Sequence, residues 1–270
     1  MPGWRRALVT GASSGIGEAL ADELSSSHVD VVLVGQNLGA LESVASRARS
    51  CGVQAEVLAA DLSTDTGIRR VESAIDAAGD VDLLVNCAGL GQWGLFADLP
   101  LQKAMETVQV NNVALVRLTY AALTRMLERG RGTIVQISSL ASMGPGPHQA
   151  VYAATKAFVS SFGQALSVEL ESTPVTCTTV LPGFTRTNYF ARVGLSPDVP
   201  ESRWMTAQQV ASMSLAGAAD GRALVIPGTR NRRELALATP FPSLTKGRAV
   251  ARARAVKRWI GRAAEGRAAD

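Results

Sequence analysis

Short apolar runs alternate with longer helical stretches along most of this 270-residue chain. This alternation indicates a parallel sheet covered by helices on both faces, because each helix connects one strand to the next. We therefore predict a doubly wound, Rossmann-like α/β fold with about seven strands in a single domain. The strands are expected at residues 7–10, 29–34, 54–59, 81–85, 132–137, 175–181 and 223–226. The helices are expected at 15–26, 38–50, 64–78, 101–129, 148–171 and 206–219.

The charge distribution separates a body from a tail. Residues 230–270 carry 11 Lys and Arg against 3 Asp and Glu, whereas the remaining residues carry 16 against 20. The tail is therefore strongly basic and the body mildly acidic, so the net charge of +4 does not indicate a nucleic-acid partner for the body. We expect one folded domain over residues 1–230 and a basic, partly helical or disordered extension over 231–270.

Cysteine usage and hydropathy indicate the cellular compartment in which we expect the protein. Cys51, Cys87 and Cys177 are odd in number and far apart, so we expect neither a disulfide framework nor a metal site. The N-terminus shows no secretory signal, and no apolar run is long enough to cross a membrane. We expect a cytoplasmic protein.

A glycine-rich turn, TGASSGIG at residues 10–17, joins the first expected strand to the first helix. Glycines permit a tight turn and let a pyrophosphate approach the backbone closely. The helix N-terminus adds unpaired N–H groups and the positive end of the helix dipole. An isolated glycine motif would also suit an ordinary turn, but its position after the first strand favours a dinucleotide site.

Tyr152 and Lys156 lie four residues apart in the expected helix 148–171, so their side chains share one face. A free tyrosine has a pKa of about 10, and a neighbouring cation lowers the pKa by favouring the phenolate. Such a tyrosine can give a proton to a carbonyl oxygen as hydride arrives, or take one in reverse. Most isolated matches to this spacing are surface pairs, so the surrounding residues decide its meaning.

Two serines end the expected strand 132–137, and Ser139 lies 13 residues before Tyr152. Ligands of open α/β sheets bind at the carboxyl ends of strands, where a hydroxyl can stabilise charge on a reacting oxygen. We take Ser139 as the candidate, with Ser138 as the alternative if the register differs by one. A turn or a helix cap would also explain the hydroxyl.

Three further motifs support this: NCAG at 86–89 follows the fourth expected strand, PGFTRT at 182–187 follows the sixth, and QVNN at 109–112 lies within the expected helix 101–129. With these, the chain resembles the short-chain dehydrogenase/reductase family in its small single-domain form, over residues 5–228. The resemblance implies an NAD(P)-dependent oxidoreductase that interconverts a carbonyl and an alcohol by hydride transfer. It also implies a homodimer or homotetramer acting on a small-molecule substrate.

The resemblance assigns roles to individual residues. Tyr152 would be the acid/base, Lys156 would lower its pKa and hold the nicotinamide ribose, and Ser139 would orient the carbonyl. Asn111 would support a proton relay through a water, although Asn112 stands beside it. The implied cofactor-binding residues are Gly11, Ser13, Ser14, Gly15, Ile16, Gly17, Gln36, Asn37, Asp61, Leu62, Asn86, Ala88, Gly89, Tyr152, Lys156, Pro182, Gly183, Thr185 and Thr187.

The choice of cofactor depends on the end of the second strand. NAD-binding sheets often carry an acid there to hold the ribose 2′-hydroxyl, but this chain has Gln36 and Asn37. Neither repels a 2′-phosphate, and both can donate to one, although the arginine common in NADP-preferring relatives is missing. This favours NADP(H) over NAD(H). Asp61 resembles the aspartate that bonds the adenine amino group; a helix cap or a loop acid would also account for it.

Two segments interrupt the strand–helix rhythm. Residues 183–204 form a long connection of the kind that often acts as a lid, with the aromatic residues Phe184, Tyr189, Phe190 and Trp204. In the basic tail, apolar residues recur at helical spacing from Val250 to Ala263, mostly as alanine. A solvated, partly disordered extension explains this better than a helix with weak membrane-surface contact.

Two other functions are compatible with the same motifs. One is a cofactor-binding sensor without turnover, which would not need the complete set of Asn, Ser, Tyr and Lys. The other is a membrane-surface protein that acts through its basic tail.

Overall fold

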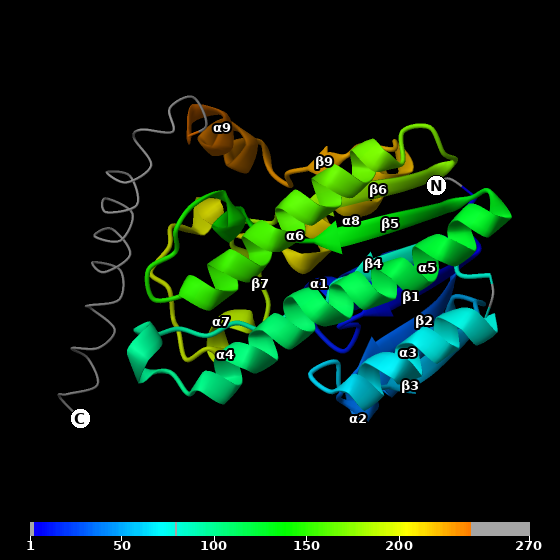
Figure 1. The fold of residues 1–270 in the computed structure, drawn as a ribbon, viewed down its shortest axis with the longest axis horizontal. Helices are drawn as coiled ribbons and strands as arrows, with labels where there is room; N and C mark the ends of the chain where they lie inside the picture. Colours follow the sequence, from blue (N-terminus) through cyan, green and yellow to red (C-terminus); the bar gives the residue numbers. More distant parts are fainter. Residues whose placement is uncertain (1–2, 79, 239–270) are drawn as a thin grey trace.

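The sheet has seven parallel strands in the order β3-β2-β1-β4-β5-β6-β9 (Figure 1). The structure, a computed structural model, describes residues 3–78 and 80–238. The strands are β1 (Arg6–Thr10), β2 (Asp30–Gly35), β3 (Ala55–Ala59), β4 (Leu83–Asn86), β5 (Gly132–Ile137), β6 (Val175–Val180) and β9 (Leu224–Val225). The predicted doubly wound fold is confirmed, with each strand within about two residues of its expected position.

Helices cover both faces of the sheet (Figure 1). One layer is α1 (Gly15–Ser26), α2 (Leu38–Ser50) and α8 (Ala207–Ala219); the other is α3 (Asp65–Ala78), α5 (Leu115–Arg129) and α6 (Ala150–Glu169). Each layer encloses its own cluster of buried aliphatic side chains. The central strands β1, β2 and β4 are buried on both faces, which explains their runs of Val and Leu. Strands β5 and β6 also bury polar side chains, among them Gln136 and Thr178.

The predicted helix over 101–129 is three elements instead of one. It consists of α4 (Leu101–Val108), a π-helical turn η2 (Gln109–Ala114) and α5. A π-turn inserts one extra residue, which shifts the phase of the apolar stripe but leaves helical periodicity on both sides of it, so the pattern predicts one helix. Asn111 lies in this turn.

Helix α6 begins at Ala150, two residues after the predicted start. The reason is local: His148 has a φ of 65°, in the left-handed region, and cannot continue a helix. The short 3₁₀ turns η1 (Phe96–Asp98) and η3 (Leu140–Met143) precede α4 and α6 respectively.

The connection over 183–204 has structure of its own. It contains β7 (Thr185–Arg186), α7 (Tyr189–Arg192) and η4 (Glu201–Arg203), and β7 pairs with β8 (Met205–Thr206). The last described element is α9 (Thr229–Ala238), which crosses the domain boundary predicted at residue 230. The rest of the predicted tail, including its apolar stripe, lies outside the described residues.

Three observations concern the whole described chain. None of its helices is long and apolar enough to span a membrane. Cys51, Cys87 and Cys177 are all free thiols. Across residues 3–78 and 80–238, no group of three His, Cys, Asp or Glu side chains is placed to hold a metal ion.

Candidate active site

A cavity of about 1030 Å³ opens at the carboxyl ends of β1, β4, β5 and β6. Its walls come from the α1 turn, the segments after β4 and β5, the start of α6, the 183–204 connection and α9. Lys156, Arg192 and Arg203 contribute positive charge, and no Asp or Glu is among the lining residues. The electrostatics of the cavity therefore favour an anionic ligand.

The glycine-rich turn forms one end of the cavity from backbone atoms. Gly11 has a φ of +69°, and a Cβ there would lie 2.9 Å from Ala88 Cα; a Cβ on Gly17 would lie 2.2 Å from Gly11 O. The N-cap residue Ser14 makes no side-chain cap hydrogen bond, so the first N–H groups of α1 are not capped by it. A helix N-terminus in this state, lining a cavity, fits a pyrophosphate.

The segment after β4 is held against this turn. Thr10 Oγ1 accepts hydrogen bonds from the N–H groups of Cys87 and Ala88, both at 3.0 Å. Gly89 lies beside Lys156, since a Cβ on it would be 3.4 Å from Lys156 Nζ. Ala88 and Gly89 thus line the cavity as predicted.

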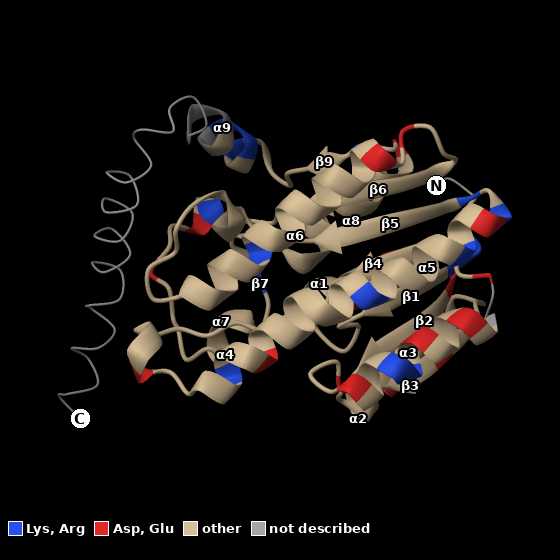
Figure 2. Cartoon of the chain, in the orientation of Figure 1, with Lys and Arg blue, Asp and Glu red and all other residues tan. Residues whose placement is uncertain are grey.

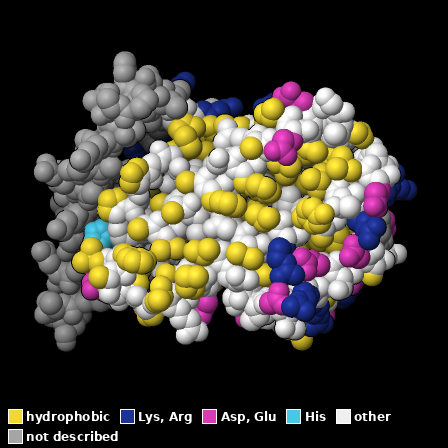
Figure 3. Space-filling view, viewed as in Figure 1, with side chains coloured by type: hydrophobic (Ala, Val, Ile, Leu, Met, Phe, Trp, Pro, Cys, Tyr) yellow, Lys and Arg dark blue, Asp and Glu magenta, His cyan; other side chains and the backbone are white. Residues whose placement is uncertain are grey.

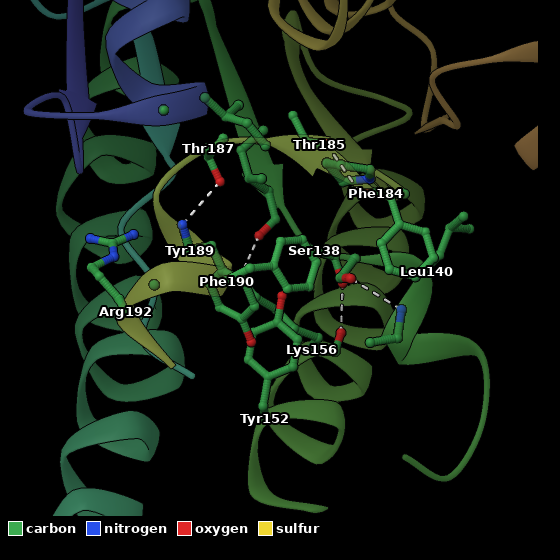
Figure 4. Close-up of a pocket in the computed structure, with 18 of the residues that line it drawn as sticks. Ser138, Leu140, Tyr152, Lys156, Phe184, Thr185, Thr187, Tyr189, Phe190 and Arg192 are labelled. Carbon is green, nitrogen blue, oxygen red and sulfur yellow. Dashed lines mark hydrogen bonds between the residues drawn. The ribbon is translucent and has the colours of Figure 1, made fainter. Parts of the chain in front are cut away.

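Lys156 is buried, and its Nζ donates to Ile137 O at 2.9 Å. Burial lowers the pKa of Lys156 to about 8 because the ammonium loses hydration. The Nζ lies 5.9 Å from the centre of the Tyr152 ring. Tyrosine and lysine therefore share a face, as their spacing predicts, and both point into the cavity (Figure 4).

The sequence predicts that Lys156 lowers the pKa of Tyr152, but in the structure the pKa of Tyr152 is raised. Burial raises the pKa of Tyr152, and hydrogen bonding from Ser139 and Tyr189 only partly offsets this. The physical reason is that desolvation disfavours the phenolate, while Lys156 directs its Nζ to a backbone carbonyl. The spacing of four residues places Tyr152 and Lys156 side by side, but it does not determine which acceptor the Lys156 Nζ binds.

The two serines after β5 have different surroundings. Ser138 is buried, and its Oγ donates to Lys156 O at 2.7 Å and lies 2.8 Å from Ser160 Oγ. Ser139 is half-buried; its Oγ accepts from Ala141 N at 3.0 Å and is within hydrogen-bonding reach of Tyr152. The geometry therefore favours Ser139 as the hydroxyl available to a ligand.

Asn111 is buried beneath the cavity floor, 1% exposed. Its Oδ1 accepts from Leu90 N at 2.8 Å, and its Nδ2 donates to Leu90 O and to Thr155 Oγ1, both at 2.9 Å. Asn112 donates to Thr155 O instead. Both asparagines thus tie η2 to α6, but only Asn111 also fixes the segment that carries Gly89.

Five of the predicted cofactor residues do not line the cavity: Gln36, Asn37, Asp61, Leu62 and Asn86. Gln36 Nε2 donates to Asp61 Oδ1 at 2.6 Å, and Asn37 caps α2 by accepting from Ala40 N. The Leu62 side chain belongs to the core, and Asn86 donates to the buried Thr119 and Gln136. Gln36, Asn37 and Asp61 are exposed beyond the cavity rim at the ends of β2 and β3.

The PGFTRT segment lies where the sequence predicts it, along the cavity wall. Pro182 O accepts from Leu140 N at 2.9 Å, and Thr185 Oγ1 donates to Gly183 O at 3.1 Å. Thr187 packs against the glycine-rich turn, with its methyl carbon 3.0 Å from where a Gly15 Cβ would stand. All four predicted residues of this segment line the cavity.

Sequence reasoning missed the contribution of α9. Asn231 and Leu235 line the cavity, and Asn231 Nδ2 would lie 2.8 Å from a Cβ on Gly183. Trp93 also lines it and stacks on His148 at 5.7 Å. No pattern in the arginine-rich segment 229–238 distinguishes it from a solvated tail, so only the fold could show this role.

Comparison with known proteins agrees with this architecture. The family model described as short chain dehydrogenase matches residues 5–196. An uncharacterized oxidoreductase from Myxococcus xanthus is 35% identical over 189 residues, which are 70% of this chain and 75% of that protein.

Two solved structures show the same fold. A short-chain dehydrogenase from Sphingobium yanoikuyae in complex with NADPH has a TM-score of 0.80 and 30% identity, covering 88% of this chain and 97% of that one. The bulky-bulky ketone specific alcohol dehydrogenase from Comamonas testosteroni has a TM-score of 0.76 and 32% identity, covering 87% and 91%. This chain therefore belongs to the short-chain dehydrogenase family and is an oxidoreductase of alcohol and carbonyl groups.

Proposed function

We propose that the protein reduces a ketone with NADPH, or oxidises the corresponding alcohol, through Ser139, Tyr152 and Lys156. The observation that carries this proposal is the meeting of these three side chains in one cavity with the uncapped N-terminus of α1. A bound nicotinamide supplies or accepts the hydride in such a reaction. The protein supplies the proton and the electrostatic environment.

The proton sits on Tyr152. Its raised pKa keeps the phenol protonated at neutral pH, ready to donate to a carbonyl oxygen. Ser139 donates a second hydrogen bond to that oxygen and stabilises its developing charge. Lys156, with a pKa of about 8, remains largely protonated at neutral pH and stabilises the phenolate left behind.

For Asn111 we propose a supporting role in the proton path. Its side chain fixes the backbone of Leu90 and the hydroxyl of Thr155, on the two segments that flank Lys156. A water held there would exchange protons with the lysine.

The residues that would hold the cofactor form two groups. The turn from Gly11 to Gly17, with Ala88, Gly89 and Thr185 to Thr187, suits the pyrophosphate and nicotinamide ends. At the adenosine end, Ser13, Gln36 and Asn37 would meet the ribose phosphate; a Gly35 Cβ would be 3.2 Å from Ser13 Oγ, which places Ser13 beside the end of β2. The NADPH of the Sphingobium structure supports the choice of NADP(H).

The substrate side of the cavity favours a bulky, apolar ketone. Trp93, Leu140, Met143 and Leu195 line it, and Phe184 and Phe190 stack at 5.9 Å between ring centroids. Aromatic and aliphatic walls with few polar groups bind hydrophobic ligands by burial. The similarity to an alcohol dehydrogenase for ketones bulky on both sides points the same way.

Titration with NADPH and NADH, followed by tryptophan fluorescence, tests the proposal first, because Trp93 lines the cavity. We expect saturable binding of both and tighter binding of NADPH. NADPH consumption should then be faster with aryl alkyl ketones than with acetone. Absence of binding by either cofactor at millimolar concentration would contradict the proposed function.

We also propose that the protein is a homo-oligomer. Leu101, Met105, Tyr120, Phe158 and Val168 are between 44% and 74% exposed on α4, α5 and α6. Figure 3 shows hydrophobic side chains across the face where Figure 1 has α4, α5 and α6, and Figure 2 shows few charges along α6. Exposed apolar surface of this kind suits a second copy of the chain. A monomer by light scattering at micromolar concentration would contradict this.

The free thiols support a reducing, cytoplasmic setting, which we include in the proposal.

A further inference from the structure

A chain of three serine hydroxyls joins the end of β5 to α6 and to the turn η3. Ser138 Oγ lies 2.8 Å from Ser160 Oγ, and Ser160 Oγ lies 3.0 Å from Ser142 Oγ. Ser138 directly follows β5, Ser160 lies on α6 and Ser142 lies on η3. Ser138 and Ser160 are buried and Ser142 is half-buried. The chain therefore links three segments of the protein through its interior.

Both ends of this serine chain finish at main-chain carbonyls of residues in the proposed mechanism. At one end, Ser138 Oγ donates to Lys156 O at 2.7 Å, and Figure 4 shows Ser138 beside Lys156. At the other end, Ser142 Oγ donates to Ser139 O at 2.6 Å, and Ser142 N donates to the same oxygen at 3.0 Å. The chain thus connects the backbone of Lys156 to that of Ser139.

Donor counting identifies Ser160 as the member on which the chain depends. A serine hydroxyl has one hydrogen to donate and two lone pairs that accept. Carbonyl oxygens can only accept, so the hydrogens of Ser138 and Ser142 are both used at the two ends of the chain. The Ser160 hydrogen is then the one that serves the contacts with Ser138 and Ser142. Within the chain, neither neighbour can replace it as donor.

The place of Ser139 relative to Tyr152 depends on how η3 sits against α6. Ser139 is the N-cap of η3, where its Oγ accepts from Ala141 N at 3.0 Å, whereas Tyr152 stands on α6. The contact between Ser160 and Ser142 crosses from one element to the other. Neither of these two serines lines the cavity. Ser160 can therefore affect a bound ligand only through the residues that it holds.

We propose that Ser160 is a positioning residue, whose hydroxyl holds η3 against α6 so that Ser139 and Tyr152 reach the same carbonyl oxygen. This inference rests on the proposed function and adds a residue to it. The physical reason is that two donors must both lie within hydrogen-bonding distance of one oxygen. A displacement of about 1 Å at a reacting group can lower a rate by about 100-fold.

Ser160→Ala tests the proposal by removing the shared donor. Ser138 and Ser142 would still donate to their carbonyls, but they would no longer be linked. We expect kcat for ketone reduction to fall about tenfold, while KM for the ketone and the Kd for NADPH stay within about twofold, because only the placement of Ser139 changes. Ser161→Ala, at an exposed serine one residue further along α6, is the matched control and should change neither. Turnover by Ser160→Ala at the control's rate would contradict the proposal.

A double-mutant cycle asks whether Ser160 acts through Ser139. If it does, Ser160→Ala should lower kcat by less than about twofold in the Ser139→Ala background, where there is no hydroxyl left to position. An equal loss in the wild-type and Ser139→Ala backgrounds would contradict the proposal.

Amide hydrogen exchange of the cofactor-free protein separates failure of this inference from failure of the proposed function. The N–H groups of η3 donate within the turn and to the segment after β6. Without the Ser160 hydroxyl, exchange over residues 140–142 should become about tenfold faster, and Ser161→Ala should leave it unchanged. Unchanged exchange in Ser160→Ala would refute the inference even if the enzyme reduces ketones. Faster exchange in a protein that turns over no ketone would refute the proposed function and leave the contact established.

Discussion

The two ends of the cavity are built from different material. At the α1 end, the wall is main chain: the turn over Gly11 to Gly17, with uncapped N–H groups. At the other end, the wall is side chains from α6, the 183–204 connection and α9. A backbone site depends on conformation, so glycine positions determine it; a side-chain site depends on which segments the fold brings together. Substitutions at the two ends should therefore fail in different ways.

Tyr152→Phe is expected to have the largest effect. Loss of the proton donor should lower turnover by about 10³-fold, while the Kd for NADPH stays within about twofold, because the main-chain end is untouched. Steady-state kinetics and fluorescence titration check the two parts. Retained turnover in this variant would remove Tyr152 from the mechanism.

Gly17→Ala should have the opposite signature. The new Cβ would overlap the Gly11 carbonyl, which is rigid backbone, so the turn must open. We expect NADPH binding to weaken about 100-fold and the melting temperature to drop by several degrees. The control is Gly39→Ala in the first turn of α2, where the nearest atom to the new Cβ is 3.7 Å away. If Gly17→Ala binds cofactor normally, the main-chain end is not the pyrophosphate site.

Substitutions at Gln36 test the edge of the main-chain end, where side chains would contact the ribose of the cofactor. Gln36→Asp should favour NADH by about tenfold, because a carboxylate repels a 2′-phosphate and accepts from a 2′-hydroxyl. Gln36→Arg should favour NADPH by a similar factor, because a guanidinium pairs with phosphate. The ratio of the two cofactor dissociation constants measures both. An unchanged ratio in both variants would place the ribose elsewhere.

The smallest expected effect is a pH dependence of stability. The pKa of Lys156 is about 8 in the folded, cofactor-free protein and about 10.5 when unfolded. Between these values the unfolded state binds more protons, so the lysine's contribution to the free energy of unfolding rises as pH increases. Lys156→Met should remove this rise. Urea denaturation at pH 7.5 and 9.5 measures it, with Lys103→Met, an exposed lysine, as control. Equal slopes in wild type and Lys156→Met would mean that the buried lysine keeps its proton over this pH range, so that its pKa is not lowered.

Much of the fold followed from local pattern alone. Apolar runs of the right length place the central strands, because a strand buried on both faces has few exposed polar positions, and β-branched residues mark the others. The glycine-rich turn and the Tyr152–Lys156 pair were likewise proposed from residue type and spacing, since each depends on neighbours within one turn of chain, and Ser139 was proposed with the help of the family resemblance. The sequence places Gln36 and Asn37 after β2. It does not show that Gln36 donates a hydrogen bond to Asp61 or that Asn37 caps the N-terminus of α2.

Tertiary structure decided the rest. It broke the predicted helix at η2, the π-turn that carries Asn111, whereas the helical periodicity on both sides of the turn predicts one continuous helix. It brought α9 against Gly183, and Tyr189 against Gly91 and Tyr152, across separations in sequence that no local pattern spans. The sequence by itself determined the scaffold, and it named the candidates for the main-chain site and for the reactive groups. Packing between distant segments decided which side chains share the cavity, and desolvation in that packing raises the pKa of Tyr152 and lowers that of Lys156.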